Sequence, residues 1–153
     1  MPIASLREIA LTYLERCPRT CEEVRRRLRR AHAPEEEIEQ IVSAFQRAGL
    51  LNDEQYALDW VESRARRKGY GRDRLSAELR LKGVAREQIE RALELLEPER
   101  EFEAALQAAA NRLADADPND PAVRRRLAGF LQRRGYKWET IAKVIERLTA
   151  NDI

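Results

Sequence analysis

The sequence predicts an all-α protein made of three tandem three-helix modules, helix-turn-helix-like repeats that form an elongated, curved chain. Three observations support this fold class. The 153 residues include only six glycines and six prolines, which favours helices over a sheet with many turns. Apolar residues recur at spacings of three and four, as they do on one face of a helix. The same apolar skeleton then appears three times along the chain.

The repeat is clearest from Leu28, Leu79 and Leu131, which lie 51 and 52 residues apart. Each has an apolar residue four positions before it and others ten, fourteen and seventeen positions after it. This spacing predicts two amphipathic helices joined by a tight turn. Another apolar helical pattern precedes each pair, so each module has three helices. We expect the modules at residues 1–51, 52–97 and 98–153.

Each predicted module is about 50 residues long and would bury little apolar surface by itself. Its stability should therefore depend on packing against its neighbour. Units that contact only their neighbours form a row.

Local signals indicate where the helices of the first module begin and end. Thr20 and Glu23 form a capping box at the start of its second helix. Pro34 is placed for the first turn of its third helix, and the glutamates that follow face the positive end of the helix dipole. Gly49 ends that helix.

Similar signals continue in the other modules. Asn52 and Asp53 can cap the fourth helix, and Pro121 is placed to start the eighth. Gly83 and Gly135 are predicted to close the second helix of their modules with a positive φ. His32 occupies the same place in the first module. Histidine tolerates that conformation less well than glycine, so this turn is predicted to differ.

The composition argues against several classes of protein. The 29 basic and 27 acidic residues give a net charge of +2, so the chain is not a simple polycation. It has no apolar run of about 20 residues that would span a membrane and no signal-peptide pattern, which favours a cytoplasmic protein. Two cysteines and one histidine are too few for a zinc site. No nucleotide-binding or nucleophile–base motif appears, so we expect neither catalysis nor a cofactor.

Positive charge is concentrated in residues 64–84, which hold eight basic and two acidic residues. The second helices of the first and third modules are also rich in arginine. Because the modules repeat, these residues are predicted to line up along one face, which would suit a phosphate backbone or an acidic protein. The candidate binding residues are Arg25, Arg26, Arg29, Arg30, Arg64, Arg66, Arg67, Lys68, Tyr70, Arg72, Arg74, Arg80 and Lys82.

Other interpretations of these patterns remain open. A single arginine on a helix is more often just solvated, and Tyr70 and Tyr136 more simply seal a helix corner than stack on bases. Trp60 and Phe102 are most simply core residues, and the two cysteines apolar filler. The helix after each turn is rich in glutamate, which phosphates would repel, so sequence-specific reading of duplex DNA in the helix-turn-helix manner is disfavoured.

At this point a family resemblance emerges. The sequence resembles the RecX family of bacterial regulators of the RecA recombinase, in segments 23–28, 49–57 and 63–84 and in Arg133-Arg134-Gly135-Tyr136. The resemblance implies a protein that binds RecA filaments on single-stranded DNA. It implies a place in the filament's helical groove and less strand exchange, ATP hydrolysis and coprotease activity, hence a weaker SOS response. We expect a monomer that contacts the DNA weakly or through RecA.

Two other hypotheses are kept beside this one. The chain could bind nucleic acid without RecA, through non-specific phosphate contacts that weaken steeply with salt. It could also be a helical scaffold for some other acidic protein, with no affinity for DNA at moderate salt.

Overall fold

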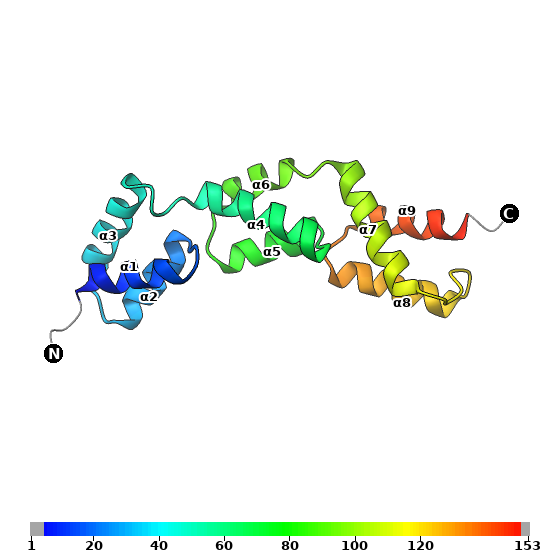
Figure 1. The fold of residues 1–153 in the computed structure, drawn as a ribbon, viewed down its shortest axis with the longest axis horizontal. Coiled ribbons are helices and arrows are strands. Elements are labelled where there is room, and N and C mark those ends of the chain that lie inside the picture. Colours follow the sequence, from blue (N-terminus) through cyan, green and yellow to red (C-terminus); the bar gives the residue numbers. More distant parts are fainter. Residues whose placement is uncertain (1–4, 151–153) are drawn as a thin grey trace.

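The computed structural model describes residues 5–150, and within that range the chain forms nine helices and no strand. They are α1 (Leu6–Arg16), α2 (Cys21–Arg30), α3 (Glu35–Arg47), α4 (Asp53–Lys68), α5 (Arg72–Leu81), α6 (Arg86–Glu94), α7 (Pro98–Leu113), α8 (Pro121–Arg133) and α9 (Trp138–Thr149). Figure 1 shows that they form an elongated, gently curved chain, with α1–α3 at one end and α7–α9 at the other. The predicted fold class is confirmed.

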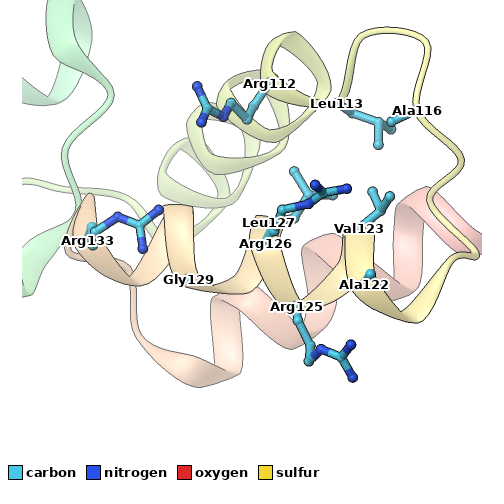
Figure 2. A pocket seen from close by; sticks show the side chains of 10 residues that line it. All are labelled: Arg112, Leu113, Ala116, Ala122, Val123, Arg125, Arg126, Leu127, Gly129 and Arg133. Carbon is cyan, nitrogen blue, oxygen red and sulfur yellow. The ribbon is translucent and has the colours of Figure 1, made fainter.

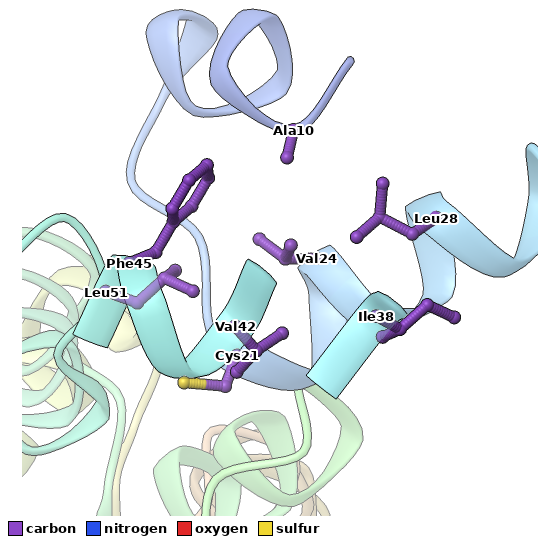
Figure 3. Packing of buried hydrophobic residues seen from close by; sticks show 8 residues of the cluster. All are labelled: Ala10, Cys21, Val24, Leu28, Ile38, Val42, Phe45 and Leu51. Atoms are coloured by element: carbon purple, nitrogen blue, oxygen red, sulfur yellow. The ribbon is translucent and has the colours of Figure 1, made fainter. Parts of the chain in front are cut away.

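Each group of three helices has its own apolar core. We call α1–α3 the first module, α4–α6 the second and α7–α9 the third. Leu28, Leu79 and Leu131 are fully buried, one in each of three separate clusters of buried residues. Figure 3 shows the first cluster, in which side chains from all three helices meet. Because the clusters are separate, the arrangement of the modules depends on the contacts between them.

Most of the predicted helix ends are confirmed. Thr20 and Glu23 form the capping box of α2, Asn52 caps α4, and Pro121 begins α8. Gly49, Gly83 and Gly135 all have positive φ angles. Pro34 differs slightly from the prediction, because it is the N-cap of α3 and the helix begins at Glu35.

The turn at His32 was predicted wrongly. His32 has a φ of +61°, in the same left-handed region as Gly83 at +80°. The hydrogen bonds also match: the His32 amide donates to the Arg29 carbonyl and the Ala33 amide to Leu28, as Gly83 and the residue after it do in the second module. The module's packing therefore fixes the turn, despite the cost of holding a side chain in that conformation.

This strain predicts that His32→Gly stabilises the protein. Glycine adopts a positive φ without the steric cost, although it gains more freedom in the unfolded chain. We expect a net gain of about 0.5–1 kcal/mol in the free energy of unfolding, measured by urea denaturation. The His32 side chain is exposed, so little packing is lost with it, and a loss of stability would contradict the explanation.

The two cysteines are in different environments, so the prediction that they serve as apolar filler holds for Cys21 alone. Cys21 is buried and Cys17 is exposed. Burial, and then the Asp53 carboxylate, raise the pKa of the Cys21 thiol to about 12. The thiolate is the reactive form, so Cys21 has almost none of it at neutral pH.

We therefore expect a disulfide reagent to modify Cys17 quickly at pH 8 and Cys21 only as the protein unfolds. The reaction can be followed by the absorbance of the released thiolate, first without and then with urea. Cys17→Ser should remove the fast phase alone. Two fast phases in the folded protein would contradict the buried position of Cys21.

Candidate functional site

The first and second modules meet where α2 begins and α5 ends. The Thr20 hydroxyl, fully buried, donates a hydrogen bond to the Lys82 carbonyl at 2.6 Å. Arg26 donates to the Leu81 carbonyl at 2.9 Å. A β-carbon on Gly83 would lie 2.3 Å from the Glu22 β-carbon, so glycine is required there for close approach as well as for its φ. The last carbonyls of a helix have no amide partner within the helix. At the end of α5, Thr20 and Arg26 donate hydrogen bonds to these carbonyls.

The second and third modules meet in the same way, where α5 begins and α8 ends. The Gly71 amide donates to the Arg134 carbonyl at 2.7 Å, and Arg74 donates to the Arg133 carbonyl at 3.3 Å. A β-carbon on Gly135 would lie 2.3 Å from that of Arg74. In the repeat, Gly71 corresponds to Thr20, and Arg134 corresponds to Lys82. We call these two contacts the joints.

The joints place the second helices of the modules in a row. The start of α2 meets the end of α5, and the start of α5 meets the end of α8. Figure 1 shows these three helices along one long edge of the molecule. Their dipoles meet positive end to negative end, which is favourable. The arginine-bearing helices therefore share one edge of the molecule.

Tyr136 and Tyr70 both lie at the second joint. The Tyr136 hydroxyl donates to the Gly69 carbonyl at 2.7 Å, and burial raises its pKa to about 12, so it stays a donor at neutral pH. Arg74 lies 3.7 Å from the centre of the Tyr70 ring and donates to its hydroxyl. Both tyrosines therefore have structural contacts at the second joint. Phe102 packs on the core of the third module, whereas Trp138 is 69% exposed.

Several candidate residues of the second module hold the structure together. Arg74 and Tyr70 belong to the second joint. Arg72 bonds to Glu101 at 3.0 Å and to the Leu96 carbonyl at 2.9 Å. Lys82 lies 3.6 Å from Glu23 across the first joint. These side chains have protein partners, so their contribution to a binding surface is smaller than their charge indicates.

In the first module, three of the four candidate arginines form ion pairs. Arg25 pairs with Glu39 at 2.8 Å, and Arg29 pairs with Glu35 at 2.7 Å. The hydrogen bond from Arg29 lowers the pKa of the Glu35 carboxyl group. Arg26 lies 3.6 Å from Glu22. Arg26, Arg29 and Arg30 are exposed and Arg25 is partly buried, and glutamates of α2 and α3 offset much of the charge of the three paired arginines.

The remaining candidates are less constrained. Within residues 5–150, no acidic partner lies within ion-pair distance of Arg30, Arg67, Lys68 or Arg80, which are all exposed. Arg66 has a weak, exposed pair with Glu62 at 3.4 Å, and Arg64 lies 4.0 Å from the centre of the Trp60 ring. Trp60 is half-buried rather than a full core residue. The most available charge of the candidate set lies at the ends of α2, α4 and α5.

The third module adds arginines that the candidate set leaves out. Arg124, Arg125, Arg126 and Arg133 are exposed on α8, and Figure 2 shows Arg126 and Arg133 beside a hollow next to α7. The signal for them was present in the sequence, because no acidic residue lies between positions 124 and 137.

Among residues 5–150, no group of three or more histidine, cysteine or acidic side chains could hold a metal ion. No helix in that part of the chain is long and apolar enough to cross a membrane.

Known proteins share this arrangement of three three-helix modules. Models of the first, second and third three-helix domains of RecX match residues 7–43, 52–93 and 99–145. The regulatory protein RecX of Streptomyces coelicolor is 38% identical over 95% of this chain and 78% of its own length. That of Thermobifida fusca is 40% identical over 87% of this chain and 72% of its own length.

Solved structures agree with the sequence comparison. The crystal structure of RecX from Lactobacillus salivarius superposes with a TM-score of 0.83 at 25% identity, over 95% of both chains. All three modules are matched by the family models, and the chain belongs to the RecX family.

Proposed function

We propose that this protein binds RecA filaments assembled on single-stranded DNA and restrains them. It lowers strand exchange, ATP hydrolysis and coprotease activity, and thereby weakens the SOS response. It acts as a cytoplasmic monomer by binding alone, without catalysis, and touches the DNA weakly or through RecA. A ligand of this kind shifts the filament population by its different affinities for the assembled and dissociating states.

The observation that carries this proposal is the row of second helices held by the two joints. An elongated, curved molecule with arginines along one edge has a shape suited to a helical groove. Arg30, Arg67, Lys68 and Arg80 have no acidic partner among residues 5–150 and can pair with carboxylates or phosphates of a partner. Membership of the RecX family and the implied role of that family support the same partner.

The test measures ATP hydrolysis by RecA on single-stranded DNA, with the protein well below one copy per RecA and at two salt concentrations. We expect the wild type to lower the rate. The triple variant Arg30→Glu/Arg67→Glu/Arg80→Glu should lose most of this inhibition while keeping its helical circular dichroism. Each of these arginines lies in the last turn of its helix.

A matched control is available. Arg16, Arg47 and Arg147 also lie in the last turns of their helices, α1, α3 and α9, none of which is a second helix. The variant Arg16→Glu/Arg47→Glu/Arg147→Glu has the same net charge as the first triple variant and should still inhibit RecA. Arg30 and Arg80 lie in the row of second helices and Arg67 lies at the end of α4, so if the first triple variant still inhibits, neither the row nor the end of α4 binds the filament. If RecA is unaffected by wild type but naked DNA is bound tightly at low salt, non-specific DNA binding replaces this proposal.

A further inference from the structure

A groove lies between the end of α7 and the length of α8 in the third module. Its volume is about 690 Å³. Figure 2 shows Arg112 on α7, Arg126 and Arg133 on α8, and Arg125 pointing away from the groove. None of these residues belongs to the joints through its side chain. The groove is thus separate from the contacts that align the modules.

The rim of the groove is positively charged. No acidic residue lines it, and none of its arginines has an acidic partner among residues 5–150. The adjacent loop carries Asp115, Asp117 and Asp120, none of which lines the groove; Asp117 accepts from the Asn119 amide and Asp120 caps α8. Gly129 gives Arg133 room, since a β-carbon there would lie 3.2 Å from its Nη1.

The floor of the groove is aliphatic. Leu113, Ala116, Ala122, Val123 and Leu127 line it. Val123 and Leu127 are 7% and 3% exposed, so they show only part of their surface there. A phosphate backbone could reach the arginines but would leave this apolar surface uncovered. An occupant that carries both anionic and apolar groups matches floor and rim together.

Phe130, next to the groove, also favours an acidic peptide over a nucleic acid as the ligand. The guanidinium groups of Arg112 and Arg134 lie 5.3 Å and 4.9 Å from the centre of the Phe130 ring. A base would have to displace an arginine in order to stack there, and stacking is a main source of affinity for single strands. An arginine held against a ring still presents its N–H edge to a carboxylate.

From the charged rim, the aliphatic floor and the occupied ring, we propose that this groove binds an acidic segment of a partner protein. The segment carries two or more carboxylates, which pair with Arg112, Arg126 and Arg133. It also carries at least one large apolar side chain, which covers Leu127 and its neighbours. This is a second, peptide-binding surface, which lies between α7 and α8 and shares no residue with Arg30, Arg67, Lys68 and Arg80.

The test uses a panel of fluorescent synthetic peptides in which glutamates flank a helical pair of leucines, isoleucines or phenylalanines. Binding is followed by fluorescence anisotropy. We expect at least one peptide to bind, and its affinity to fall by about tenfold or more in Arg112→Glu/Arg126→Glu. The control Arg47→Glu/Lys143→Glu has the same net charge and the same placement, one residue in a last turn and one within a helix. It should bind like the wild type.

A second variant guards against loss of folding. Ala122 lies in the first turn of α8, where a carboxylate is favourable to the helix, and it lines the groove. Ala122→Glu should therefore keep the fold and still lower the affinity of the groove for the peptide. The proposal is overturned if no peptide of the panel binds, or if serine in place of the apolar residues leaves affinity unchanged. It is also overturned if oligothymidylate binds the groove with the same sensitivity to Arg112→Glu/Arg126→Glu.

Discussion

Gly71→Ala is expected to open the joint between the second and third modules, at a cost of about 3 kcal/mol. The φ of Gly71 is −90°, which alanine adopts readily, so the backbone conformation itself is no obstacle. The obstacle is contact: the new β-carbon would lie 2.6 Å from the carbonyl carbon and oxygen of Gly135. These are backbone atoms of the next module and cannot rotate away.

The consequence extends beyond the clash. Moving Gly135 away breaks the hydrogen bond from the Gly71 amide to Arg134 and that from the Asp73 amide to Gly135, at 2.7 Å and 3.0 Å. Because the second and third modules have separate cores, each can remain folded while the joint opens. We therefore expect urea unfolding to lose its single transition and the radius of gyration from X-ray scattering to rise.

Gly49→Ala is the control. Gly49 has a positive φ of 77°, but nothing lies within 4 Å of its added β-carbon. The control therefore carries the steric cost of φ, about 1–2 kcal/mol, without a clash. If Gly71→Ala cost no more than this control, and the scattering profile were unchanged, the joint would not be the rigid contact that its geometry indicates.

The comparison of Gly71, Gly83 and Gly135 with His32 shows what the sequence could predict. Glycine at the end of a helix predicts a positive φ, because that rule depends only on neighbouring residues, and Gly83 and Gly135 follow it. The same rule failed for His32, where packing of the surrounding module imposes the conformation. The second role of the three glycines, close approach to another module, depends on residues far away in the chain and could not be predicted.

The same limit applies to the candidate binding residues. Composition and the repeat correctly placed arginines on three second helices, but not their partners. Arg26 donates to the Leu81 carbonyl, 55 positions away, and Arg134 reaches the Lys68 carbonyl across 66 positions. A sequence shows where charge is concentrated. Which charges remain available to a partner is decided by contacts between modules.

Glu101→Ala is expected to lower the free energy of unfolding by about 2–4 kcal/mol. The N-cap of α5 is Gly71, which has no side chain to cap the helix, whereas Thr20 caps α2. Glu101 of α7 supplies the missing acceptor: its carboxylate lies 3.4 Å from the Arg72 amide and 3.0 Å from the Arg72 Nε. A carboxylate at the start of a helix is also favoured by the dipole.

Burial makes this ion pair more important than the surface pairs. The Glu101 side chain is 9% exposed and that of Arg72 is 28% exposed, so removing the carboxylate leaves a partly buried guanidinium without its ion-pair partner and the Arg72 amide without its acceptor. Glu90→Ala is the control, because its pair with Arg86 has exposures of 58% and 90%. Such surface pairs contribute about 0–1 kcal/mol.

A double-mutant cycle with Arg72→Ala tests the cause of the effect. If Glu101 acts through Arg72 and the start of α5, the two substitutions together should cost clearly less than the sum of their separate costs. Additive costs would show that Glu101 acts elsewhere. Glu101→Ala and Glu90→Ala could also lower the free energy of unfolding by the same amount within error. That result would show that α5 does not depend on the neighbouring module for its cap. The idea that these modules are completed by their neighbours would then rest on the glycine contacts alone.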